Sequence, residues 1–133
     1  MATQSGAQPQ DSGGYTVLVV DDEEAVRRVA ALLLEAAGYT VLTAATADEA
    51  LGLVREQPGI DAVLLDLMLP DRSGASVAAD LRRLRPAVPI VVSSGYDDRT
   101  VAERVEGIAG VRFLRKPYAA DDLMAALVDA LPA

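Results

Sequence analysis

The stretch VLLDLMLPDRSG, residues 63–74, runs from an apolar segment through an aspartate into a loop. The segment around it, DAVLLDLML at residues 61–69, is predicted to form a strand, and YTVLVV at residues 15–20 suits a strand that is buried on both faces of a parallel sheet. Asp66 interrupts this apolar run, and a buried charge without a partner costs on the order of several kcal/mol. We therefore expect Asp66 to have partners that other parts of the chain supply.

The same alternation of apolar runs and amphipathic stretches extends over the chain on both sides of this segment. Strands are predicted at residues 15–20, 39–44, 61–69, 88–94 and 110–114. Helices are predicted within residues 21–38, 47–57, 75–85, 97–106 and 119–131. Five β/α units joined by right-handed crossovers predict a doubly wound α/β domain of the flavodoxin-like type, with five helices around a five-stranded parallel sheet of strand order 2-1-3-4-5.

Local signals set the expected ends and faces of the first two helices. The alternating pattern of residues 39–44 is typical of an outer strand. Gly38 is expected to end the first helix, and Pro58 with Gly59 is expected to end the second. Thr46 and Glu49 are spaced as a capping box. One apolar face is predicted for the first helix, formed by Val26, Val29, Ala30 and Leu33.

Composition bounds the function. The 133 residues fit one domain, predicted at residues 15–133, after a disordered tail at residues 1–14 that does not resemble a signal peptide. Cysteine and histidine are absent, so a metal would need oxygen ligands. The net charge of −8 disfavours nucleic acid and anionic membranes as partners, and no apolar run is long enough to span a bilayer. We expect a cytoplasmic protein.

Polar residues follow four of the five predicted strands, where ligands bind in such sheets. In the order 2-1-3-4-5 these four strands are neighbours, so we expect their polar ends to converge. The residues at these ends are Asp21, Asp22 and Glu23, then Asp66, then Ser93 and Ser94, and last Arg115 and Lys116.

This set of side chains suits phosphoryl transfer. Converging carboxylates repel each other unless a cation neutralises them, and Mg²⁺ is the natural counter-ion for oxygen ligands. Asp66, at the centre, is the candidate nucleophile. Ser94 and Lys116 suit the oxygens of a phosphoryl group, and Lys116 is the only lysine in a chain with eleven arginines. A compact ammonium fits a tight phosphate site better than a planar guanidinium does.

From Tyr15 to Leu131 the sequence resembles the receiver domain of two-component response regulators. The motifs that carry the resemblance are VLVVDDEEAVR, VLLDLMLPDRSG, PIVVSSGY and FLRKPY, in this order and at these spacings. The resemblance implies that Asp66 is the phosphoacceptor and that Lys116 binds the phosphate. It also implies a cis peptide bond before Pro117.

The resemblance implies a role for five further positions. Asp22 matches the direct Mg²⁺ ligand and Asp21 its water-bridged companion, while Met68 matches the position that offers its backbone carbonyl to the metal. Ser94 matches the switch hydroxyl, with Ser93 as the alternative, and Pro89 sets the register that favours Ser94. Phe113 occupies the aromatic switch position.

Two positions are individual to this chain. The position two residues after the phosphoacceptor often carries a polar side chain that helps to handle the attacking water, and here it is Met68. Its usual partner, two residues after the switch hydroxyl, is Tyr96. We hypothesise that this bulky pair screens Asp66 from water and slows the loss of phosphate.

The predicted function is Mg²⁺-dependent acceptance of a phosphoryl group from a histidine kinase or a histidine phosphotransfer protein. The phosphorylated form is expected to rearrange the face of the fourth helix, fifth strand and fifth helix for a downstream effector protein. The domain is not expected to be an enzyme in its own right, although it is expected to assist its own phosphorylation and dephosphorylation. The sequence leaves open whether phosphorylation drives homodimers.

Three alternatives were weighed against this function. A small phosphatase of the haloacid-dehalogenase type needs an Asp-x-Asp motif after the first strand, which VVDDEE does not supply. A flavodoxin is disfavoured because DDEE would repel the flavin phosphate. A receiver-like module that is never phosphorylated is disfavoured by the complete set of site residues.

Overall fold

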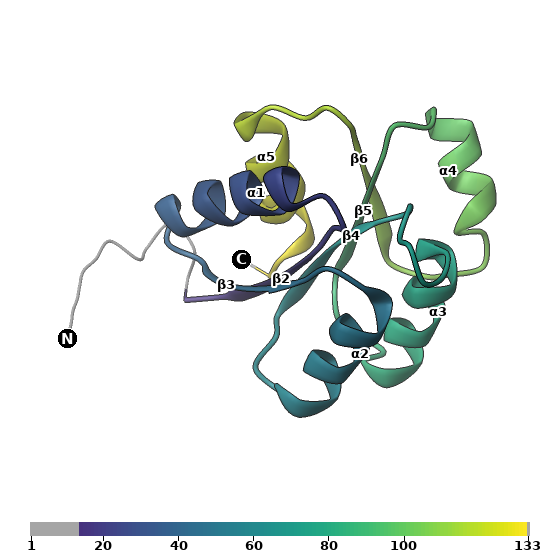
Figure 1. Cartoon of the computed structure of the whole chain (residues 1–133), viewed down its shortest axis with the longest axis horizontal. Helices are drawn as coiled ribbons and strands as arrows, with labels where there is room; N and C mark the ends of the chain where they lie inside the picture. Colours follow the sequence, from purple (N-terminus) through teal and green to yellow (C-terminus); the bar gives the residue numbers. More distant parts are fainter. Residues whose placement is uncertain (1–13, 133) are drawn as a thin grey trace.

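The computed structural model describes residues 14–132, and it shows a parallel sheet between two layers of helices (Figure 1). The strands are β2 (Thr16–Val20), β3 (Thr40–Ala44), β4 (Ala62–Asp66), β5 (Ile90–Ser94) and β6 (Val111–Arg115). The helices are α1 (Glu24–Ala36), α2 (Ala47–Glu56), α3 (Gly74–Leu84), α4 (Asp98–Arg104) and α5 (Ala120–Ala130). The expected tail, apart from Gly14, lies outside the described residues.

The strand order is β3-β2-β4-β5-β6, and all four strand pairs are parallel. This confirms the predicted order 2-1-3-4-5. Every residue of β4, the central strand, is buried, whereas β3 at the edge is partly exposed. The continuous apolar run around Asp66 therefore reflects a strand that is covered on both faces.

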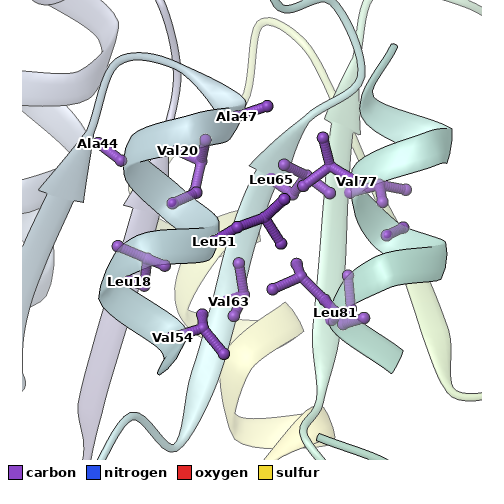
Figure 2. Close-up of a cluster of buried hydrophobic side chains, with 14 of the residues drawn as sticks. Leu18, Val20, Ala44, Ala47, Leu51, Val54, Val63, Leu65, Val77 and Leu81 are labelled. Carbon is purple, nitrogen blue, oxygen red and sulfur yellow. The ribbon is translucent and has the colours of Figure 1, made fainter. Parts of the chain in front are cut away.

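The two faces of the sheet carry separate apolar cores. Alternate residues of each strand point to opposite faces, so that Val19 packs with α1 and α5 while Leu18 packs with α2 and α3. Figure 1 shows α1 and α5 on one side of the sheet and α2 and α3 on the other. Figure 2 shows the second core, in which Leu51 of α2 and Leu81 of α3 meet side chains of the central strands.

The predicted apolar face of α1 was wrong at Val29, whose exposed fraction is 54%. The buried residues of α1 are Ala30 and Leu34, which lie four residues apart and face the sheet. Val29 instead lines an open cavity between α1 and the loop after β6, together with Val26. Apolar periodicity marked the helix correctly but did not distinguish its core face from its neighbour.

Two helices differ in detail from the prediction. α4 is shorter than the predicted 97–106, because Val105 is already outside helical geometry and Gly107 adopts a φ of 85°. Before α2, the Thr46 hydroxyl accepts from the Glu49 amide as predicted, but the Glu49 carboxylate accepts from the amide of Ala45. Within residues 14–132 no helix combines the length and apolar character needed to cross a membrane.

Candidate functional site

Lys116 and the carboxylates of Asp21 and Asp66 meet at the carboxyl end of the sheet. Asp21 directly follows β2, Asp66 ends β4 and Lys116 directly follows β6. The Lys116 Nζ lies 2.9 Å from Asp21 Oδ2 and 3.2 Å from Asp66 Oδ2. Residues up to 95 positions apart are thereby joined, which confirms that the polar strand ends converge.

Asp21, Asp22 and Asp66 form a carboxylate cluster whose ligand oxygens lie within 4.8 Å of one another. Asp21 and Asp66 are each 3% exposed, while Asp22 is exposed. The Lys116 ammonium contacts Asp21 and Asp66, so a single cation serves a cluster of three acidic side chains. Oxygen ligands at this spacing, one of them open to solvent, fit a hydrated Mg²⁺ ion.

The electrostatic balance shows how tightly this charge is held. Burial raises the pKa of Asp66 above its ordinary value, and this outweighs the amide of Met68 and the charge of Lys116, which lower it. The pKa of Lys116 is raised above its ordinary value. Burial alone would lower it, but the hydrogen bond to Asp21 and the charges of Asp66 and Asp21 outweigh that effect. Two buried acids stabilise the charged form of Lys116, whereas only one ammonium is available to stabilise the charged forms of both acids.

The loop after β4 holds Asp66 in place. Asp66 Oδ1 accepts a hydrogen bond of 2.9 Å from the Met68 amide. Behind it, a Cβ atom on Gly74 would lie 2.4 Å from Leu67 Cα and 2.6 Å from the Asp66 carbonyl oxygen. The close approach of the two backbones therefore requires glycine at the start of α3.

Backbone contacts also fix Asp21 and Lys116. Asp21 Oδ1 accepts from the Glu23 amide at 3.0 Å, and the Asp21 carbonyl accepts from Arg27 at 2.8 Å. The Lys116 amide donates to the carbonyl of Ser94 at 2.8 Å, and the peptide bond from Lys116 to Pro117 is cis, as the resemblance implied. Each charged group thus projects from a braced segment.

The two serines at the end of β5 are both buried. Ser93 lies opposite Asp66 in the strand register, and the Ser94 hydroxyl accepts a hydrogen bond of 3.0 Å from the Tyr96 amide. Phe113 lies outside the carboxylate cluster. It is half-buried in β6 and lines a cavity of about 330 Å³ together with Val101 of α4.

The loops after β4 and β5 touch through Met68 and Tyr96. The Tyr96 hydroxyl donates to Met68 Sδ at 3.4 Å, although the Met68 side chain remains 54% exposed. The guanidinium of Arg104, at the end of α4, lies over the Tyr96 ring at 4.6 Å from its centroid. The first contact joins two residues that the sequence singled out, and the second was not predicted.

Asp71 also has a role that sequence reasoning missed. Its carboxylate accepts from the amides of Ala47 at 3.0 Å and Asp48 at 3.2 Å, so it caps α2 from a loop more than twenty positions away. These hydrogen bonds, led by that from Ala47, lower the pKa of Asp71. The unpaired amides that every helix leaves in its first turn were the available signal, but they do not identify a distant partner.

Comparison with known proteins gives a consistent family. The response regulator receiver domain matches residues 17–128. The sensor kinase CckA of Brucella abortus is 36% identical over 113 residues, which are 84% of this chain and 12% of CckA. The probable transcriptional regulatory protein TcrX of Mycobacterium tuberculosis is 33% identical over 116 residues, 86% of this chain and 48% of TcrX. The chain therefore spans half or less of these curated relatives.

Solved structures show the same fold. A response regulator receiver domain protein from Clostridium thermocellum aligns with a TM-score of 0.80 and 31% identity, over 87% of this chain and 93% of that one. The chemotaxis protein CheY4 of Vibrio cholerae aligns with a TM-score of 0.83 and 25% identity, over 89% of this chain and 99% of that one.

Proposed function

The chain belongs to the family of response regulator receiver domains, which act in two-component signalling, and from this premise we propose that Asp66 accepts its phosphoryl group. The receiver domain is taken to comprise residues 15–133. The observation that carries the proposal is the position of the Lys116 ammonium, 3.2 Å from the carboxylate of the buried Asp66. Family membership also decides against the phosphatase and flavodoxin alternatives.

The donor is the phosphohistidine of a kinase or of a histidine phosphotransfer protein. A carboxylate oxygen of Asp66 attacks phosphorus, the P–N bond breaks, and its electron pair returns to the imidazole nitrogen, which is then protonated. Lys116 turns from the carboxylates toward the phosphoryl oxygens. The transfer needs mainly positioning and charge neutralisation, which the braced side chains provide.

Mg²⁺ would be held by Asp22, Asp66 and the Met68 carbonyl, with Asp21 through a water molecule. When bound, it supplies positive charge that offsets the excess carboxylates and the developing charge on the phosphoryl oxygens. The spacing of the carboxylate oxygens, within 4.8 Å, supports this assignment.

An open cavity beside Lys116 supports an approach route for the donor. About 460 Å³ lies between α1 and the loop after β6, lined by Val26, Val29 and Tyr118. Val29 in its wall and Leu32 on the same helix are apolar side chains that are 54% and 59% exposed. A donor helix that covers these residues would bring its phosphohistidine toward Asp66 and would explain why α1 exposes them.

The output follows from a two-state rearrangement. Ser94 moves to hydrogen-bond the phosphoryl group, and Phe113 turns into the cavity of about 330 Å³ beneath α4. The face of α4, β6 and α5 then changes its affinity for an effector protein. The net charge of −8 supports a protein partner rather than nucleic acid or a membrane, and we place the protein in the cytoplasm.

Intact mass measurement after treatment with acetyl phosphate and Mg²⁺ tests the phosphoacceptor. We expect one added phosphoryl group on the wild type, and none on Asp66→Asn or when EDTA replaces Mg²⁺. Asp121→Asn, which removes an exposed carboxylate from α5, should behave as the wild type. Equal phosphorylation of Asp66→Asn, or none of the wild type under excess donor, would overturn the proposal.

A further inference from the structure

Tyr96 is held from both ends. Its backbone amide donates to the Ser94 hydroxyl at 3.0 Å, and its phenol hydroxyl donates to Met68 Sδ at 3.4 Å. Met68 in turn donates its own amide to Asp66 Oδ1 at 2.9 Å. The side chains of Met68 and Tyr96 thus bridge the two loops that flank the proposed phosphorylation site.

A third residue, which belongs to neither loop, contacts this bridge. The Arg104 guanidinium lies 4.6 Å from the centroid of the Tyr96 ring, within the range of a cation–π interaction. Arg104 is in the last turn of α4, where a positive charge is favoured by the helix dipole in any case. The dipole does not explain why the guanidinium lies over the ring.

The chemistry that this bridge would affect is hydrolysis of the aspartyl phosphate. A water oxygen attacks phosphorus, the bond between phosphorus and the Asp66 oxygen breaks, and the carboxylate leaves with the electron pair. The water gives up a proton, and inorganic phosphate is released. The attacking and leaving oxygens lie roughly in line, so the water must approach from the solvent side of the phosphoryl group, opposite Asp66.

We propose that Arg104 is a positioning residue that holds Tyr96 against Met68 and thereby lengthens the lifetime of the phosphoryl group on Asp66. The proposal rests on the proposed function of Asp66. With Arg104 in place, the bridge stays closed across the path of the water. Without it, the Tyr96 ring samples other positions, and water reaches phosphorus more often.

Lifetimes of phosphorylated variants test this role. Each variant is phosphorylated with acetyl phosphate and Mg²⁺, freed of donor, and followed by intact mass. We expect Arg104→Gln to shorten the half-life about two- to fivefold, the rate equivalent of one exposed cation–π contact. Arg104→Lys keeps a cation and should restore part of the lifetime.

The control is Arg99→Gln, which removes the same charge from the same helix. Arg99 is 89% exposed and lies 3.8 Å from Glu103, so its loss should leave the half-life unchanged. Tyr96→Phe, which removes the hydroxyl contact to Met68, should also shorten the half-life. The double variant Tyr96→Phe/Arg104→Gln should lose less than the product of the two single effects, because Arg104 acts through Tyr96.

A second readout needs neither phosphate nor metal. The chain has three methionines, Met1, Met68 and Met124, so a protein labelled at the methionine methyl groups gives a simple NMR spectrum. We expect Arg104→Gln to shift the Met68 methyl signal, because the Tyr96 side chain is then no longer held against the sulfur. Arg99→Gln should leave the signal in place.

The outcomes separate the two proposals. If the wild type is phosphorylated on Asp66 but Arg104→Gln keeps the wild-type half-life, Arg104 has no positioning role and the proposed function stands. An unmoved Met68 methyl signal in Arg104→Gln would equally overturn the role of Arg104. If the wild type accepts no phosphoryl group, the proposed function fails, and the lifetime proposal fails with it.

Discussion

The two ends of the sheet use positive charge in opposite ways. At the carboxyl end, the Lys116 ammonium contacts the carboxyl groups of Asp21 and Asp66. At the other end, Arg82 donates to the carbonyls of Ala109 at 2.8 Å and Gly110 at 3.2 Å, and Arg85 donates to those of Pro58 and Ile60.

This difference separates a scaffold from a site. Neutral carbonyls satisfy the guanidinium groups without adding charge, so the loops at that end are simply tied together. At the other end a single lysine contacts a cluster of acidic side chains, and a bound divalent cation would supply the further positive charge that such a cluster and an incoming phosphoryl group need. Exchanging the two kinds of cation, or removing one, should therefore have different consequences at each end.

The largest effect is expected from Lys116→Arg, which keeps the charge but changes its shape. A planar guanidinium cannot replace a rotatable ammonium between two buried carboxylates, and phosphorylation by acetyl phosphate should slow by about 100-fold. The rate is measured by intact mass against time.

The control is the reverse exchange at the neighbouring position. Arg115→Lys alters an exposed side chain and should leave the rate unchanged. A rate for Lys116→Arg within about threefold of the wild type, well short of the loss expected for a preorganised charge, would show that charge alone matters at the site.

The next effect is expected from Arg82→Met at the opposite end. Burial lowers the pKa of Arg82, and its guanidinium bridges the end of α3 and the loop before β6. Losing these contacts should reduce the free energy of unfolding by about 2–3 kcal/mol, measured by urea denaturation, while phosphorylation persists. Arg83→Met removes a more exposed neighbour that pairs with Asp80 and should cost clearly less; equal losses would contradict the comparison.

The smallest effect concerns Asp71, which caps α2 near the site end. Its pKa is lowered by the hydrogen bonds from Ala47 and Asp48, so its contribution is complete above the unfolded-state value of about 3.9 and is lost as pH falls through the folded-state pKa. Asp71→Asn should lower the urea midpoint slightly at pH 7, and the difference from the wild type should shrink as pH falls below about 4.

The control for Asp71→Asn is Asp48→Asn, which removes a negative charge from the first turn of α2, the turn that Asp71 caps. It should change the midpoint less than Asp71→Asn does at neutral pH. If the deficit of Asp71→Asn stayed constant down to low pH, the ionised cap would not be its cause.

Most of the fold was predictable because its strands are buried. β4 is a continuous apolar run, and the alternation of such runs with helices predicts the parallel doubly wound sheet, while the count of five strands favours the observed order. The same reasoning predicted that Asp66 and Lys116 would meet, since parallel strands end at one edge. Family resemblance then assigned a role to each position.

What escaped prediction depends on tertiary contact. Val29 has the spacing of a core residue, and only the packing of α1 shows that it faces the open cavity. Asp71 and Arg104 have ordinary loop and helix-end positions, and their partners lie at Ala47 and Tyr96 through folding alone. Local patterns do not encode which distant group will come within reach.

The tight packing at Gly74 has a consequence for how this domain could be retuned. With a backbone atom 2.4 Å from where a methyl group would sit, position 74 tolerates no variation, and the loop behind Asp66 is closed to adjustment. Arg104 is exposed instead, and Tyr96, although it packs against the core, is only partly buried, so both positions leave more room for substitution than position 74 does. A set of variants made to test the proposed control of phosphoryl lifetime would therefore sample positions 96 and 104 and keep the glycine at position 74.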